Sequence, residues 1–188
     1  MERLVKQANF SDSNARLEDI QYLSDRHLNK DVFQKLSTNK YLDEHKNIIF
    51  VGATGSGKSY LACALGKNAC LSGTRVNYIR LPDLLADLKL ARIEGRYPKV
   101  VKQCQKIDLL IIDEFLLVPI PQQAQQDILE VLERRYRLHS TIFCSQFKVD
   151  GWHERLGGGV LADAILDRAL SKSQQILIEG EKSMRSRI

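Results

Sequence analysis

The sequence predicts an α/β fold in which a five-stranded parallel sheet carries helices on both faces. Short apolar runs alternate along the chain with longer segments of helical periodicity, which is typical of strand–helix units in a parallel sheet. The run IDLLII at residues 107–112 is almost continuously apolar, as expected for a strand buried on both faces. The 188 residues are enough for one domain with its own core.

Five runs rich in β-branched or other apolar residues are the predicted strands. Each is short and is followed by a glycine or by polar residues, as strands of buried sheets commonly are. They lie at residues 47–51, 75–79, 107–112, 141–145 and 174–178.

Segments whose apolar residues recur three or four positions apart are the predicted helices. Gly73 ends the first helix, Pro82 opens the second and Gly95 ends it. In the fourth helix we expect an inward stripe formed by Ile128, Leu129, Val131, Leu132 and Tyr136. The helices are predicted at residues 58–71, 83–93, 96–105, 122–138 and 160–170.

The chain divides into two parts by its composition. Residues 1–46 are polar and charged, and we interpret them as an N-terminal lead-in with short helices. Residues 47–188 contain all of the predicted strands and form the predicted core.

A glycine-rich segment directly after the first strand carries the clearest functional signal. The sequence GATGSGKS at residues 52–59 matches the pattern G-x-x-x-x-G-K-[ST] between a strand and a helix. Glycines let backbone N–H groups surround phosphates, and the following helix adds the positive end of its dipole. Lys58 would reach the β- and γ-phosphates of ATP, and the Ser59 hydroxyl would bind Mg²⁺. The predicted phosphate-binding residues are Gly52, Ala53, Thr54, Gly55, Ser56, Gly57, Lys58, Ser59 and Tyr60.

Two adjacent carboxylates follow the third predicted strand. Asp113 is expected to hold Mg²⁺, and Glu114 to polarise an attacking water. We base this division on the opposite directions of neighbouring side chains at a strand end. The pair favours water as the phosphate acceptor, although two solvated charges capping a strand would look the same without the upstream phosphate loop.

The positive charge of the chain is concentrated in one segment. Residues 75–106 contain eight basic and three acidic residues, and this excess of +5 equals the net charge of the whole chain. Such a surface would neutralise DNA phosphates without reading sequence, although a solvated helix face is the plain alternative. The candidate DNA-binding residues are Lys89, Arg92, Arg96, Lys99 and Lys102.

The ordered set of motifs resembles the IstB-type ATPases, which help transposition, and the related DnaC/DnaI-type helicase loaders, both of the AAA+ class of P-loop NTPases. The resemblance covers residues 17–185. Besides the phosphate loop and LLIIDE at 109–114, it rests on RRYRLHSTIFCSQF at 134–147, LADAILDRAL at 161–170 and IEGEKSMR at 178–185.

The resemblance implies further site residues. Gln146 stands where the class has a polar sensor, Arg168 matches an arginine finger that completes the site of a neighbouring subunit, and Arg185 matches a second sensor arginine. The basic segment corresponds to the region that lines a DNA channel in these assemblies. Leu116 departs from the family, which often has glycine there.

The function expected from the resemblance is an AAA+ ATPase that uses ATP and Mg²⁺ and forms a homo-oligomer on DNA. It would assist transposition with a transposase or load a replicative helicase. A P-loop phosphotransferase and a nucleotide-dependent adaptor with negligible turnover remain alternatives. The sequence has no apolar run long enough to span a membrane, so we expect a cytoplasmic protein, either truncated or a minimal member of the family.

Overall fold

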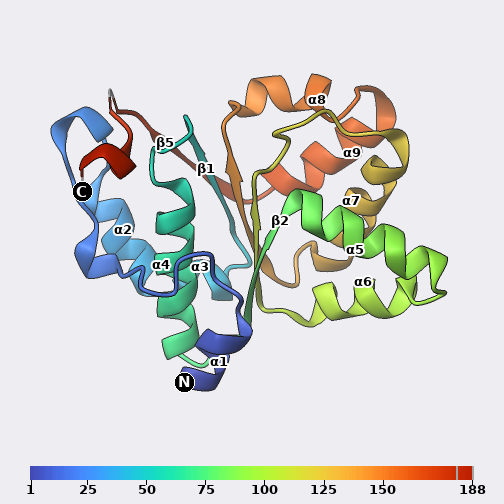
Figure 1. Ribbon diagram of the computed structural model, residues 1–188, viewed down its shortest axis with the longest axis horizontal. Helices are drawn as coiled ribbons and strands as arrows, with labels where there is room; N and C mark the ends of the chain where they lie inside the picture. The colour runs from blue at the N-terminus through green and yellow to red at the C-terminus, as the bar shows by residue number, and fades with distance from the viewer. Residues whose placement is uncertain (181, 188) are drawn as a thin grey trace.

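The computed structural model describes residues 1–180 and 182–187 and contains one five-stranded parallel sheet (Figure 1). The strand order is β2-β3-β4-β1-β5, so the prediction of a parallel five-stranded α/β fold is confirmed. Observed and predicted strand ends differ by at most two residues. The strands are β1 (Asn47–Gly52), β2 (Val76–Arg80), β3 (Leu109–Asp113), β4 (Ser140–Ser145) and β5 (Ser173–Ile178).

Strand β1, which lies between β4 and β5, contributes to both hydrophobic layers. Its side chains alternate between the two faces of the sheet because successive residues of a strand point in opposite directions. Ile48 and Phe50 belong to one buried cluster, and Ile49 and Val51 to the other. The strand is buried from its second residue onward, which explains its almost entirely apolar sequence.

The first part of the chain, together with the helix after the phosphate loop, covers one face of the sheet (Figure 1). The helices there are short, apart from the one that follows β1. They are α1 (Glu2–Gln7), α2 (Lys30–Ser37), α3 (Lys40–Asp43) and α4 (Lys58–Leu71), with the 3-10 turns η1 (Leu17–Asp19) and η2 (Ser24–Arg26) between them.

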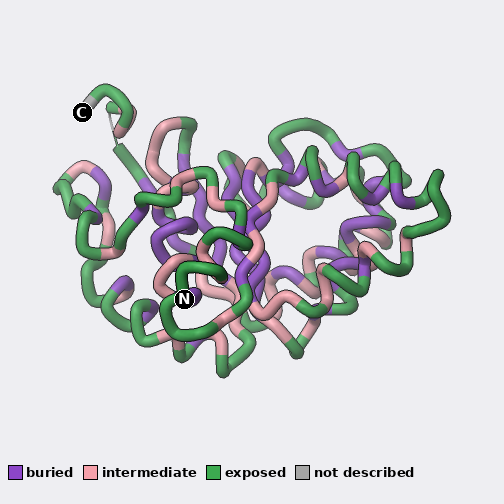
Figure 2. Tube along the Cα trace, turned by 60° about the horizontal axis from the view of Figure 1, so that its bottom comes forward, coloured by how far each residue is buried: buried purple, intermediate pink, exposed green. Residues whose placement is uncertain are grey.

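The helices that follow β2, β3 and β4 cover the other face (Figure 1). Figure 2 shows their buried sides turned toward the sheet and their exposed sides outward. They are α5 (Leu81–Ile93), α6 (Tyr97–Lys106), α7 (Gln122–Arg135), α8 (Trp152–Arg155) and α9 (Gly159–Leu170), with η3 (Val149–Gly151) before α8.

The end of α7 corrects the predicted helix 122–138. The helix ends at Arg135, Tyr136 is its C-terminal cap, and Arg137 takes a left-handed conformation with φ of 59° that stops the helix. The expected inward stripe is therefore wrong at its last position, because Tyr136 is only half-buried beyond the helix and Leu138 is exposed.

A buried arginine that the sequence analysis did not single out lies at this helix end. Arg135 is 1% exposed, and its guanidinium donates to the carbonyl oxygens of Cys104, Ile107 and Ser140, each at 2.6 Å. Burial lowers its pKa to about 10. Arg135 thus ties α6 and α7 to the start of β4.

The N-terminal segment packs directly on the sheet. Ala8 and Phe33 belong to the same buried cluster as β1 and α4, and the backbone N–H of Tyr78 in β2 donates to the carbonyl oxygen of Ala8 at 2.7 Å. The division of the chain at residue 46 stays a prediction. Residues 181 and 188, which belong to the predicted core, lie outside the described residues, and residue 181 is part of the run at 178–185.

None of the helices within residues 1–180 and 182–187 combines the length and the apolar character that crossing a membrane requires.

Candidate nucleotide-binding site

The predicted phosphate loop connects β1 to α4 at the carboxyl edge of the sheet. Gly55 and Gly57 have φ of 80° and 95°, a left-handed conformation that glycine adopts without steric cost. Helix α4 begins at Lys58, directly after Gly57. The first N–H groups of a helix have no partners within it, so this end of α4 is suited to bind an anion.

Lys58 is folded back over the loop. Its Nζ donates to the carbonyl oxygens of Gly52 at 2.7 Å and Ala53 at 2.8 Å, and the residue is only 9% exposed. Burial lowers the pKa of Lys58, while the charge of Asp113 opposes that shift. The ammonium group is therefore held within the loop by carbonyl oxygens, which phosphate oxygens can replace.

Ser59 and Asp113 meet across the gap between α4 and β3. The Ser59 hydroxyl donates to Oδ2 of Asp113 at 2.5 Å, and Asp113 is buried at the end of its strand. Carboxylate and hydroxyl oxygens are hard donors of the kind that Mg²⁺ takes together with nucleotide phosphates. A hydroxyl that donates one proton keeps lone pairs for a cation, so the two residues fit the predicted magnesium ligands.

Glu114 has left the strand conformation. Its φ is 52°, and its backbone N–H donates to Oδ1 of Asp113 at 2.7 Å. The chain therefore turns directly after β3, which ends at Asp113. The prediction that Asp113 and Glu114 alternate as neighbouring residues of one strand was wrong, because Glu114 lies outside the strand.

The Glu114 carboxylate is held by an arginine that the sequence analysis missed as a site residue. Arg80, the last residue of β2, donates to its Oε2 at 2.8 Å. Arg80 lies in register with Asp113 on the neighbouring strand. Only the register of β2 against β3, which places Arg80 beside Asp113, could have predicted this contact.

Leu116 adopts a backbone conformation that favours glycine. Its φ is 62°, a conformation that costs a residue with a side chain about 1 kcal/mol or more. The residue is completely buried in the second hydrophobic cluster, and packing of the leucine side chain offsets that strain.

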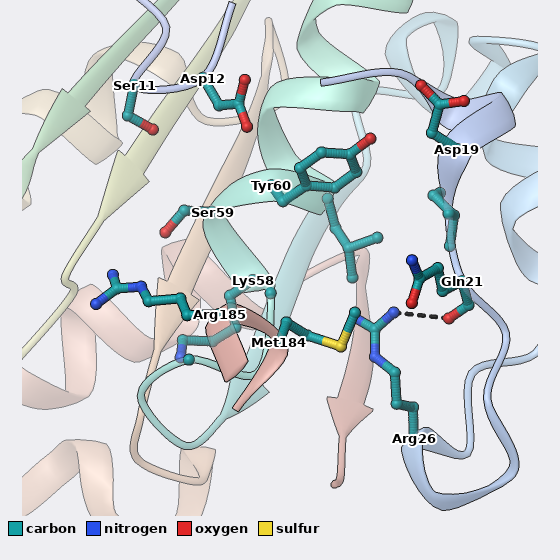
Figure 3. Close-up of a pocket in the computed structure, with 14 residues that line it drawn as sticks. Ser11, Asp12, Asp19, Gln21, Arg26, Lys58, Ser59, Tyr60, Met184 and Arg185 are labelled. Carbon is teal, nitrogen blue, oxygen red and sulfur yellow. Dashed lines mark hydrogen bonds between the residues drawn. The ribbon is translucent and has the colours of Figure 1, made fainter. Parts of the chain in front are cut away.

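A pocket of about 480 Å³ opens beside the phosphate loop (Figure 3). This volume is within the range of small-molecule sites. The pocket is lined by the phosphate loop and by an N-terminal segment that contains none of the nucleotide-binding motifs. The lining residues from that segment are Ser11, Asp12, Asp19, Ile20, Gln21 and Arg26.

Arg26 connects this segment to the phosphate loop. It is buried, and its guanidinium donates to the carbonyl oxygens of Gln21 at 2.7 Å and Ser56 at 3.0 Å. Tyr60 also lines the pocket, and its hydroxyl donates to the carbonyl oxygen of Arg16 at 3.3 Å. Because these residues are far apart in sequence, local patterns could not have placed them together.

The C-terminal turn η4 (Met184–Arg187) forms another side of the pocket. The backbone N–H of Met184 donates to the carbonyl oxygen of Gly55 at 2.8 Å. Arg185 lines the pocket together with Lys58 and Ser59 (Figure 3). The structure thus brings Arg185 to the phosphate loop.

Gln146 follows β4 and is exposed. The residue before it, Ser145, is buried, and its hydroxyl donates to the carbonyl oxygen of Phe115 at 2.9 Å. This contact joins the ends of β3 and β4. The sensor role of Gln146 stays a prediction.

Arg168 lies at the opposite edge of the sheet. The side-chain amide of Asn47, the first residue of β1, donates to the carbonyl oxygens of Arg168 and Ala169 at 3.4 and 3.0 Å. Gly52 is five residues farther along β1, which corresponds to roughly 17 Å. Arg168 therefore lies far from the phosphate loop of its own chain.

The side chain of Arg168 is held in place from several sides. Its Nε donates to Oε2 of Glu133 at 2.5 Å, it also pairs with Asp167, and its guanidinium lies 4.6 Å from the centre of the Tyr136 ring. The side chain nevertheless keeps 27% of its surface exposed.

The five candidate DNA-binding residues lie on α5, α6 and the turn between them, and they divide into two groups. Arg92 pairs with the buried Asp127 at 2.5 Å and lies 4.0 Å from the centre of the Tyr97 ring, and Arg96 pairs with Glu94. Lys89, Lys99 and Lys102 are exposed. The lysines are therefore the better candidates for contact with a partner.

The strand order, the phosphate loop and the carboxylates at the end of β3 define a P-loop nucleotide-binding protein of the AAA+ class. The chain belongs to the family of IstB-like ATP-binding proteins, whose pattern matches residues 1–188.

Two relatives are named as ATP-binding proteins of insertion sequences. The chain is 44% identical over 169 residues to protein y4pL of Sinorhizobium fredii, covering 90% of this chain and 69% of that protein. It is 33% identical over 165 residues to the IS21 protein of Pseudomonas aeruginosa, covering 88% and 62%. The expected resemblance to IstB-type proteins is thereby confirmed.

Solved structures confirm the fold. The chain is similar to a DnaC helicase loader, with a TM-score of 0.74 and 21% identity over 88% of this chain and 97% of that one. It is also similar to AMPPCP-bound DnaA from Aquifex aeolicus, with a TM-score of 0.73 and 19% identity over 94% and 54%.

Proposed function

We propose that this chain is a magnesium-dependent ATPase that assembles with further copies of itself on DNA and assists a transposase. The observation that carries the ATPase assignment is the cluster of Lys58, Ser59, Asp113 and Glu114 at one edge of the sheet. Lys58 and the N-terminus of α4 would bind phosphate oxygens, and Ser59 and Asp113 would hold Mg²⁺. The ion would draw charge from the phosphate oxygens, and Glu114 would orient and polarise water.

Assembly is supported by the position of Arg168. An arginine at the amino edge of the sheet can complete a nucleotide site only in another copy of the chain. The names of the insertion-sequence relatives favour transposition over helicase loading. The exposed lysines of α5 and α6 support DNA as the surface on which the copies assemble.

The ATPase proposal is tested by measuring phosphate release from ATP and Mg²⁺, with and without duplex DNA. We expect hydrolysis without any added acceptor, faster with DNA. Glu114→Gln should reduce the rate by about 100-fold or more while nucleotide binding is kept. Glu130→Gln is the matched control, because Glu130 is a glutamate on α7 that pairs with Arg134 and contacts none of the described residues of the phosphate loop.

The other two functions give different results in the same assay. Phosphate transfer that requires a small-molecule acceptor would replace the proposal with a phosphotransferase. Tight ATP binding with no phosphate release, even with DNA and at high protein concentration, would replace it with an adaptor.

A further inference from the structure

The buried tyrosine of β2 belongs to none of the nucleotide-binding motifs, yet it reaches the proposed magnesium ligand. Tyr78 is 8% exposed, and its hydroxyl donates to Oδ2 of Asp113 at 2.5 Å. Its backbone N–H donates to the carbonyl oxygen of Ala8 at 2.7 Å, and it pairs in register with Ile111 of β3. The ring packs in the first hydrophobic cluster. The hydroxyl therefore approaches Asp113 from a fixed position.

The carboxylate of Asp113 accepts three hydrogen bonds in the structure. Tyr78 and Ser59 both donate to Oδ2, and the N–H of Glu114 donates to Oδ1. An ionised carboxylate offers about four acceptor positions, two on each oxygen. These contacts fill both positions on Oδ2 and one on Oδ1. One position on Oδ1 remains for a cation or for water bound to it.

The three donors differ in what else they do. Ser59 is itself a proposed magnesium ligand, and Glu114 belongs to the proposed catalytic pair. Tyr78 has neither role. Tyr78 belongs to the edge strand β2, which pairs with one side of β3. Strand β4 pairs with the other side of β3.

We propose that Tyr78 is a positioning residue of the magnesium site, whose hydroxyl occupies Oδ2 of Asp113 and so leaves Oδ1 to face magnesium or its bound water. This inference rests on the proposed function, because it assumes that the chain binds ATP with magnesium. Groups that orient a metal-binding carboxylate commonly change metal affinity by about 10- to 100-fold when removed.

Tyr78→Phe tests the proposal because it removes one oxygen and keeps the packed ring. Binding of a fluorescent, non-hydrolysable ATP analogue is measured in two series, one with increasing MgCl₂ and one in EDTA. We expect the magnesium concentration for half-maximal binding to rise by about 10-fold or more. Affinity in EDTA should stay unchanged, since Tyr78 is not expected to contact the nucleotide.

Tyr41→Phe is the matched control. Tyr41 is also a buried tyrosine of the first cluster, and its hydroxyl has no hydrogen-bond partner within the described part of the chain. It lies near the start of β4, where its carbonyl oxygen accepts from Ser140, at the edge of the sheet opposite the phosphate loop. This variant should leave both binding series unchanged.

The outcomes separate this inference from the function on which it rests. An unchanged magnesium requirement in Tyr78→Phe, with wild-type protein that needs magnesium, would overturn the role of Tyr78 alone. Equal weakening in magnesium and in EDTA would show a purely structural role and would overturn it as well. If the wild-type protein bound no nucleotide under any condition, the proposed function would fail together with this inference.

Discussion

The phosphate loop at one edge of the sheet and Arg168 at the other hold their charged side chains in different ways. At the carboxyl edge, Lys58 and Asp113 are buried, and their partners are loop carbonyls, hydroxyls and a backbone N–H of the same chain. At the amino edge, Arg168 is held by two carboxylates, those of Glu133 and Asp167, that are at least half exposed. Ion pairs within reach of solvent contribute little to stability and exchange partners at low cost.

This difference shows what each edge is suited to do. The carboxyl edge surrounds a pocket and is preorganised for a ligand that enters it. The amino edge presents a cation at the surface, where a group from another molecule can replace the present partners. One edge would bind the nucleotide, and the other would act on the nucleotide of a neighbour.

The largest expected effect tests the amino edge. Arg168→Ala should lower ATP hydrolysis by about 10³-fold, because an arginine that stabilises the transferring phosphate contributes at least that much. Nucleotide affinity at low protein concentration should not change. Mixing this variant with Glu114→Gln should restore activity. At a mixed interface, the Arg168→Ala copy supplies Glu114 and the Glu114→Gln copy supplies Arg168. Hydrolysis that is independent of Arg168 at all protein concentrations would refute action between subunits.

The next effect tests the carboxyl edge. Lys58→Ala should weaken ATP binding by about 100-fold or more, because the nucleotide loses hydrogen bonds to a charged group that contribute about 1.5–3 kcal/mol each. ATP-dependent assembly, followed by light scattering, should disappear. Lys67→Ala on the same helix is the control, because the Lys67 ammonium donates to the carbonyl oxygen of Ser13 rather than to the phosphate loop. Assembly of Lys58→Ala at the same ATP concentration that the wild-type protein needs would contradict the role of Lys58 in phosphate binding.

A smaller effect concerns the surface of α5 and α6. The double variant Lys99→Ala and Lys102→Ala should reduce the slope of log affinity for DNA against log salt by about two units. Arg92 is a poorer probe, because its ion pair with the buried Asp127 also joins α5 to α7, and Arg96 already pairs with Glu94. Lys35→Ala and Lys40→Ala, on the other face of the sheet, form the control. An unchanged slope would exclude DNA contact by these lysines.

The smallest effect concerns an ion pair at the amino edge. Hydrogen bonds from Arg75 lower the pKa of Asp108, so the pair stabilises the fold above the ordinary aspartate pKa and loses this contribution as pH falls through the lowered value. Arg75→Ala should cost at most about 1 kcal/mol at pH 7. Urea unfolding should show the same cost at pH 5 and a smaller one only below pH 3.8. A cost that shrinks between pH 7 and pH 5 would point to another titrating group.

The strands and the phosphate loop could be predicted because their signals are contiguous in sequence. Residues 47–59 contain a complete strand, loop and helix start, and Gly55 and Gly57 adopt the positive φ of the loop. The end of α7 could not be predicted, because the apolar spacing continues to Tyr136 and Leu138 while Arg137 turns the backbone.

The contacts around the site depend on register and packing, which local patterns do not encode. Arg80 meets Glu114, and Tyr78 meets Asp113, only because β2 pairs with β3 in one register. Arg26 reaches Ser56 because the N-terminal segment folds across α4. The burial of Arg135 could not be predicted for the same reason, since nothing in the sequence distinguishes it from the exposed arginine beside it, Arg134.

The pocket wall formed by residues 11–26 has a consequence for the choice of expression boundaries. A protein that began at residue 28 would keep every residue of the phosphate loop, both carboxylates, Gln146, Arg168 and the lysines of α5 and α6. It would lose the segment that lines one side of the pocket and the guanidinium that holds Ser56. Such a protein would satisfy every sequence signature of nucleotide binding and still lack one wall of the pocket beside the phosphate loop.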